Sequence, residues 1–162
     1  MTYNRFRGLY RRSVDMKGRV AIPNEFRRAL PPETNGQLYL SKGRDKTIEV
    51  HPLLEWERFE NEILLKLSKF HPDPLRLRRN LAASVIMVKL DAQGRILIPN
   101  HFKAYAEIET EVIFNGVVNY FEIWNPNNYE NYQKKADEHF LSDLENIVKY
   151  LDLSKNLNID LQ

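Results

Sequence analysis

A 17-residue segment near the start of the chain recurs in its middle. VDMKGRVAIPNEFRRAL occupies residues 14–30, and LDAQGRILIPNHFKAYA occupies residues 90–106. Seven positions are identical at one constant offset of 76 residues, namely Asp15 and Asp91, Gly18 and Gly94, Arg19 and Arg95, Ile22 and Ile98, Pro23 and Pro99, Asn24 and Asn100, and Phe26 and Phe102. Self-similarity at a fixed period indicates a chain built from two copies of one structural unit. We therefore expect the two copies to share one fold and to pack against each other.

The similarity continues beyond this motif. Gly43, Ile48, Glu49 and Val50 match Gly116, Phe121, Glu122 and Ile123 at an offset of 73, which indicates a loop three residues shorter in the second copy. The helical spacing of Trp56, Phe59, Ile63 and Leu67 is repeated by Tyr129, Tyr132, Ala136 and Phe140. We expect the stripe from Trp56 to Leu67, together with Phe70, to be core. Each copy is predicted to be a hairpin, a short helix, a second hairpin and a longer helix.

Each motif copy begins with a four-residue turn. DMKG at residues 15–18 and DAQG at residues 91–94 place Asp first and Gly fourth, the preference of a type I turn whose last position often needs a positive φ. The residues that follow alternate as in a strand. Pro23 and Pro99 then remove an amide donor, which ends the strand and suits the first turn of a helix. We predict two hairpin turns, each followed by a strand and a short helix.

The Asp and Arg of each motif point to a binding function. Asp15 precedes Arg19 by four residues, as Asp91 precedes Arg95, and a bidentate carboxylate contact could fix the direction of each guanidinium. An Arg held in this way can contact a phosphate or a guanine edge with little loss of rotamer freedom. The alternative is that Asp caps the turn and Arg only pairs with it. We favour this structural role for Asp15 and Asp91, and DNA contact for Arg19, because Lys17, Arg27 and Arg28 lie close by in the sequence. For Arg95 both roles stay open.

The charge is distributed unevenly between the two halves. Residues 1–80 contain 17 Lys and Arg against 10 Asp and Glu, whereas residues 81–162 contain 7 against 12. A basic cluster on a folded module attracts a phosphate backbone and an acidic half repels it. If nucleic acid is the ligand, we expect the first copy to carry most contacts, although an Arg-rich solvated surface is an equal alternative. The candidate DNA-binding residues are Arg11, Arg12, Asp15, Lys17, Arg19, Arg27, Arg28, Asp91, Arg95 and Lys103.

The segments GLYRRSVDMKGRVAIPNEFRRAL and KLDAQGRILIPNHFKAYA closely resemble the two signature segments of the MraZ family of bacterial transcription regulators. This resemblance covers nearly the whole chain. It implies an α+β, mainly β fold, in which tandem swapped-hairpin units of the AbrB type form a pseudo-dimeric β-barrel with peripheral helices. It also implies a sequence-specific DNA binder that assembles into a homo-oligomeric ring. Such a ring would bind direct repeats at the promoter of the division and cell wall gene cluster.

The two copies define the expected domain organisation. Residues 5–52 form the first AbrB-like repeat, residues 53–80 a helix and linker, residues 81–125 the second repeat, and residues 126–162 a C-terminal helical region. The linker is placed at residues 71–80, because Pro72 and Pro74 break the helix before them. We interpret its Arg76, Arg78 and Arg79 as a solvated surface rather than a second phosphate contact.

Other chemistries find little support in the sequence. The chain has no cysteine, and its four histidines, at 51, 71, 101 and 139, lack the spacing of a metal site. Asp15 and Asp91 each have an Arg partner that keeps them ionised, which does not suit acid catalysis. No apolar stretch approaches the roughly 20 residues of a membrane span. We expect a cytoplasmic, nucleoid-associated protein that is no enzyme, binds double-stranded DNA and itself, and needs no cofactor, metal or small-molecule substrate.

Two other classes of protein remain as alternatives. An antitoxin-like AbrB-fold protein would also bind DNA, but would carry a disordered tail that wraps a toxin partner, and the tail here is short. A pure assembly protein would show no salt-dependent DNA binding.

Overall fold

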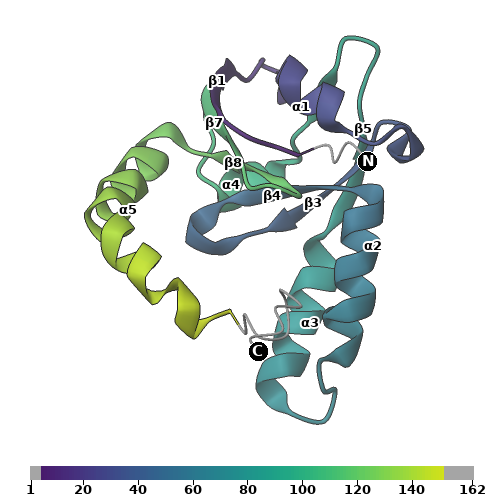
Figure 1. Cartoon of the computed structure of the whole chain (residues 1–162). Coiled ribbons are helices and arrows are strands. Elements are labelled where there is room, and N and C mark those ends of the chain that lie inside the picture. Colours follow the sequence, from purple (N-terminus) through teal and green to yellow (C-terminus); the bar gives the residue numbers. More distant parts are fainter. Residues whose placement is uncertain (1–4, 152–162) are drawn as a thin grey trace. The chain divides into compact units, whose positions relative to one another are not determined.

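The computed structural model describes residues 5–151, and these fall into two compact units that divide after Pro126. Figure 1 shows the chain. In the first unit the elements are β1 (Leu9–Ser13), β2 (Arg19–Ala21), α1 (Asn24–Ala29), η1 (Pro32–Thr34), β3 (Gln37–Lys42), η2 (Arg44–Lys46), β4 (Ile48–Pro52), α2 (Leu53–Glu62), η3 (Leu64–Lys66), α3 (Pro72–Ser84), β5 (Ile86–Lys89), β6 (Arg95–Leu97), α4 (Asn100–Tyr105), β7 (Glu111–Gly116) and β8 (Phe121–Trp124). The second unit consists of α5 (Pro126–Asn146) and η4 (Ile147–Lys149).

A six-stranded antiparallel sheet combines strands from both copies. Its order is β1-β7-β8-β4-β3-β5. Each copy contributes its second hairpin to the centre, and each edge strand pairs with the hairpin of the other copy. Neither copy therefore completes its own sheet, and the fold is mixed α+β with sheet predominating, as the sequence predicts.

A second, two-stranded sheet also joins the copies. Strands β2 and β6 pair antiparallel, and Val20 lies directly opposite Ile96. These two residues are equivalent at the offset of 76. In the larger sheet Glu49 lies opposite its own equivalent, Glu122. Both pairings are thus centred on one pseudo-two-fold axis that relates the copies.

The motif turns form, and the strands around them pair mainly with strands of the other copy. Strands β1 and β2 share only one isolated bridge, between Val14 and Val20. Their remaining pairing is with β7 and β6 of the other copy. Pairing between the copies therefore replaces most of the pairing within each copy.

One hydrophobic core joins the two sheets. Phe26 of α1 is 1% exposed, and its ring lies 4.8 Å from that of Phe121 in the six-stranded sheet and 5.6 Å from that of Phe6. Phe102, the equivalent of Phe26, is fully buried. Burying side chains of this size contributes about 1.5–3 kcal/mol each. The core holds Val20, Ile22, Ile96 and Ile98 from the motif segments and Leu38, Leu40, Ile48, Val50, Val112, Phe114, Phe121 and Ile123 from the sheet.

The helices after the first copy differ from the prediction. Helix α2 ends at Glu62, so the predicted stripe does not stay on one helix face. Trp56 is buried, but Ile63 is 50% and Phe70 is 85% exposed, and the assignment of the last two to the core is wrong. The segment expected to be a linker contains most of α3, because Pro72 and Pro74 occupy its first turn, where proline is tolerated.

Helix α5 has 21 residues and carries Tyr129, which donates to Gln133 at 3.2 Å. Its Phe140 and Leu141 are 60% and 72% exposed. Residues 152–162 of the expected C-terminal helical region lie outside the described part of the chain. Among the helices of residues 5–151, none combines the length and the apolar character that crossing a membrane requires.

Candidate nucleic-acid interface

The turn of the first motif is built around Asp15. Its Oδ1 accepts the backbone N–H groups of Lys17 and Arg19, at 2.9 and 2.8 Å, and its Oδ2 accepts Nε of Arg19 at 2.8 Å. The Gly18 amide closes the turn on the carbonyl of Asp15 at 3.0 Å, and Gly18 has φ 85°. The predicted turn and its positive-φ glycine are therefore confirmed.

The second motif repeats this geometry. Asp91 accepts the amides of Gln93 and Arg95 at 2.9 Å each and Nε of Arg95 at 2.8 Å. Gly94 has φ 75°. The backbone N–H of the motif Arg, followed by its side chain, holds the pKa of each Asp below its ordinary value of 3.8. Both carboxylates are therefore ionised at neutral pH and suited to orienting a cation.

The carboxylate fixes each guanidinium by one edge only. The contact is a single Nε–Oδ2 bond, because the other carboxylate oxygen is used by backbone amides. The expectation of a bidentate Asp–Arg contact is thus wrong. The Nη groups of Arg19 and Arg95 stay outside the ion pair, and these are the donors that reach a phosphate or a guanine edge.

The β2–β6 pairing places both Arg residues on one face. Val20 and Ile96 point into the core, at 1% and 2% exposure. Because side chains alternate along a strand, Arg19 and Arg95 lie on the opposite, outer face of the ribbon, with side-chain exposures of 35% and 28%. Leu97, opposite Arg19 in the register, is 53% exposed on the same face. The two motifs thus form one surface rather than two.

The two turns are locked together by reciprocal contacts. The Ile22 amide donates to the carbonyl of Gly94 at 3.0 Å, and the Ile98 amide donates to that of Gly18 at 2.9 Å. Each short helix also sets a basic side chain on the turn of the other copy. A Cβ atom at position 94 would lie 2.2 Å from Nη1 of Arg27, and one at position 18 would lie 3.7 Å from Nζ of Lys103.

The sequence places Arg27 near Arg19 of its own copy, whereas the structure sets it against the opposite motif. Arg27 and Lys103 are equivalent at the offset of 76. This equivalence is the feature of the sequence that indicates a matching position for the two side chains, each on the turn of the other copy. We define the motif surface as Asp15, Lys17, Arg19, Arg27, Asp91, Arg95 and Lys103. It mixes basic residues of both copies.

Three candidates lie outside the motif surface. Arg11 and Arg12 lie on β1, where Arg11 forms an ion pair with Glu111 at 2.8 Å and Arg12 lies 5.7 Å from the centre of the Tyr10 ring. Arg28 is exposed on α1. In residues 5–151 there is no group of three or more His, Asp or Glu residues placed to hold a metal ion.

The paired turns define a tandem-repeat protein with a two-stranded basic ribbon, and comparison with known proteins identifies its family. Residues 6–80 and 82–150 each match the family described as "MraZ protein, putative antitoxin-like". The chain belongs to the MraZ family.

Several relatives match nearly end to end. A protein named transcriptional regulator MraZ from Caldanaerobacter subterraneus subsp. tengcongensis is 39% identical over 153 residues, which cover 94% of this chain and 98% of the relative. Proteins of the same name from Natranaerobius thermophilus and Mycolicibacterium vanbaalenii are 35% and 36% identical. These alignments cover 90% and 83% of this chain and 98% and 91% of those relatives.

Proposed function

We propose that this protein is a DNA-binding transcriptional regulator that contacts double-stranded DNA through the motif surface. One observation carries the proposal: the β2–β6 register sets Arg19 and Arg95 on the same outer face, each held by its own Asp. Some DNA-binding regulators read the major groove with a two-stranded β-ribbon, and others read it with a helix. The relatives' names, transcriptional regulator, agree with this role.

The proposed contacts divide by chemistry. The Nη groups of Arg19 and Arg95 are the candidates for guanine O6 and N7. Lys17, Arg27 and Lys103 flank the ribbon and suit phosphate contacts, which fix register without reading sequence. The protein acts by binding alone, with Asp15 and Asp91 as positioning residues rather than acids or bases.

The finer features of the proposal come from the family. We propose that the ribbon and the six-stranded sheet close into a swapped-hairpin barrel, and that copies of the chain assemble into a ring in the nucleoid. Ring subunits would present several motif surfaces to direct repeats, and their contacts would add through effective concentration. The proposed target is the promoter of the division and cell wall gene cluster.

A footprint upstream of the protein's own gene, followed by a salt titration on the protected fragment, tests this proposal. Each neutralised phosphate lowers the slope of log affinity against log salt by about 0.9. Several contacts should give a slope well below about −3. Absence of a footprint, or a slope near zero, contradicts the proposal.

A toxin-neutralising role is the second candidate, and the family description "antitoxin-like" favours it. It predicts a stable stoichiometric complex with a protein encoded beside this gene. Co-expression of both chains and gel filtration would reveal that complex, whereas the regulator proposal requires only DNA.

A further inference from the structure

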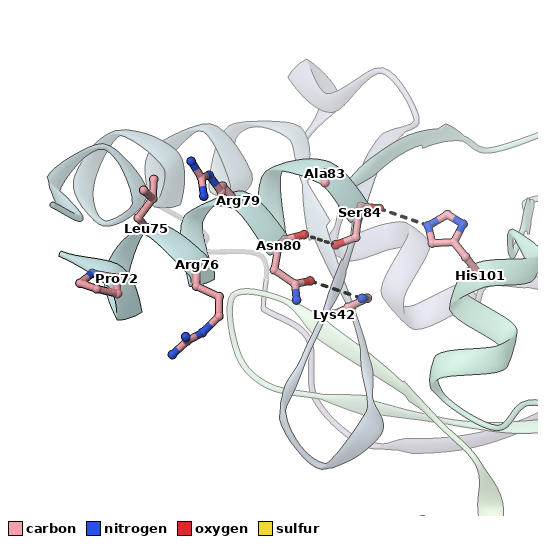
Figure 2. Close-up of a pocket in the computed structure, with 9 residues that line it drawn as sticks. All are labelled: Lys42, Pro72, Leu75, Arg76, Arg79, Asn80, Ala83, Ser84 and His101. Atoms are coloured by element: carbon pink, nitrogen blue, oxygen red, sulfur yellow. Dashed lines mark hydrogen bonds between the residues drawn. The ribbon is translucent and has the colours of Figure 1, made fainter. Parts of the chain in front are cut away.

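A basic pocket lies on α3, a helix that has no part in the motif surface. It has a volume of about 700 Å³ and is lined by Lys42, Pro72, Leu75, Arg76, Arg79, Asn80, Ala83, Ser84 and His101. Lys42 reaches it from β3 and His101 from α4, while the other seven residues lie on α3 (Figure 2). Four lining residues carry basic side chains and none is acidic. Three of the four are Lys or Arg, in a chain whose 24 Lys and Arg are nearly balanced by 22 Asp and Glu, so the lining is locally basic.

The Lys42 ammonium is held in place from two sides. Its Nζ donates to Oδ1 of Asn80 at 3.3 Å and lies 5.4 Å from the centre of the Tyr105 ring. Since Asn80 uses its carbonyl oxygen for Lys42, the two N–H groups of its amide can donate to a ligand. The Ser84 hydroxyl is occupied within the helix, because it donates to the backbone carbonyl of Asn80 at 2.9 Å.

The Arg side chains leave donor capacity in the pocket. In the described part of the chain Arg79 has no ion-pair partner. Arg76 pairs with Asp73 at 2.6 Å, but both side chains are largely exposed, at 73% and 85%. An exposed pair of this kind contributes about 0–1 kcal/mol, so Arg76 can exchange Asp73 for a stronger oxyanion. Lys42 and Arg79 line the same pocket, and both a Lys point charge and a planar Arg fork match the acceptor oxygens of a phosphate.

The pocket is not a by-product of the repeat. The position equivalent to His101 in the first copy is Glu25, an acidic residue. The apolar part of the lining, Pro72, Leu75 and Ala83, offers a wall for the organic portion of an ester. A pocket of this volume lies within the usual range for small ligands.

We propose that this pocket is a phosphate-binding site, in which Lys42, Arg79 and the Asn80 amide hold the phosphate group of an ester. That phosphate belongs either to a small molecule or to the backbone of bound DNA. Only the second source rests on the proposed function. Helix α4 carries both His101 of the pocket and Lys103 of the motif surface, so the two sites share one helix.

The test uses the full chain and three proteins: wild type, a Lys42→Gln/Arg79→Gln double variant, and Arg78→Gln as matched control. Arg78 is adjacent on α3 but donates instead to the Leu67 carbonyl at 3.3 Å. Unchanged thermal melts establish that each variant folds. Calorimetry with inorganic pyrophosphate at constant ionic strength measures the free-phosphate source. The salt slope of DNA affinity measures the backbone source.

A free-phosphate site predicts pyrophosphate binding that the double variant weakens at least tenfold and Arg78→Gln leaves unchanged. A backbone site predicts a salt slope smaller by about 1 in the double variant than in the control. If neither quantity differs between the double variant and the control, the proposal is overturned. If the protein binds no DNA, the pyrophosphate measurement still decides the pocket, so the two failures are distinguishable.

Discussion

Val20 and Ile96 occupy equivalent positions in the two copies and lie directly opposite each other in the β2–β6 pairing. An axis through this pair relates the turns, the short helices and the second hairpins. The same axis brings Arg19 and Arg95 to one face. The DNA-binding proposal depends on this relationship, because it converts two separate motifs into one surface.

The same axis sets two equivalent glutamates opposite each other, and a substitution can remove their repulsion. Glu122 lies opposite Glu49, and burial, followed by weaker effects that include Glu49, raises the pKa of Glu122 above its ordinary value of 4.5. A carboxyl with a raised folded pKa destabilises the fold when ionised; this penalty is complete above the folded pKa and absent below the unfolded one. Glu122→Gln should therefore raise the free energy of unfolding at pH 7 by up to about 1 kcal/mol.

Glutamine also keeps an acceptor for Trp124 and Asn115, which both donate to Glu122. Melts at pH 7 and near pH 4 measure the effect, which should shrink at the lower pH. Glu57→Gln, at an exposed position of α2, serves as control. A Glu122→Gln variant less stable than wild type at pH 7 would show that the carboxylate stabilises the fold.

Gly94 should tolerate a side chain less well than Gly18. Both have positive φ, but a Cβ at 94 meets the Arg27 guanidinium at 2.2 Å, whereas at 18 the nearest atom is the Ile98 carbonyl oxygen at 3.3 Å. We expect Gly94→Ala to destabilise by more than the roughly 1 kcal/mol of the backbone term alone. Denaturant unfolding of the single variants and of Gly94→Ala/Arg27→Ala measures the coupling. An additive double variant would mean that Arg27 does not pack on this turn.

Asp15 should matter for DNA affinity more than for folding. Asp15→Asn keeps an acceptor for the turn amides but loses the charge that holds Nε of Arg19. We expect a roughly three- to tenfold weaker operator affinity, about 0.7 to 1.4 kcal/mol of binding free energy, with unchanged secondary structure. Asp143→Asn on α5 is the control. Equal affinity of both variants and wild type would assign Asp15 a role in the turn only.

The pKa of Asp15 also predicts a pH dependence. Because this pKa is lowered in the folded state, the ordered turn is retained above the unfolded value and lost as pH falls through the folded one. Wild-type DNA affinity should therefore not change through titration of Asp15 between about pH 8 and pH 5. An affinity loss in that range that Asp15→Asn abolishes would contradict this assignment.

The sequence predicts the local structure within each repeat better than it predicts which segments of the two repeats contact each other. Turn chemistry around Asp15 and Gly18 depends on neighbouring residues, and the structure confirms it. The position of Arg27 on the Gly94 turn depends on which copy supplies the partner strand, and a one-dimensional offset does not contain that information. Helix α3 was missed because Pro72 and Pro74 both end helices and begin them. Phe70 is exposed because α2 ends eight residues earlier, at Glu62.

Assembly provides a further prediction. Strands β1 and β5 are the sheet edges and expose Leu9, Ile86 and Met87 at 47%, 36% and 46%. Open sheet edges with apolar side chains tend to pair with other chains. When the subunits form a closed symmetric oligomer, this pairing stops at a fixed number of chains. Light scattering at micromolar concentration should give a discrete multiple of the 19.2 kDa chain mass. A single 19.2 kDa species would contradict the proposed ring.

Operator binding by Arg19→Ala and Arg95→Ala tests the central claim most directly. The charge distribution favours the first copy, but the shared face engages both, so each substitution should weaken binding by about 1 to 3 kcal/mol for a lost base contact. Arg19→Ala should lose at least as much as Arg95→Ala. Arg58→Ala on α2, whose side chain is 63% exposed, should bind as wild type. All three variants must keep a cooperative melt and the wild-type oligomer mass. Wild-type affinity in both motif variants, or loss of the oligomer before loss of DNA, would mean that the motifs serve folding rather than DNA recognition.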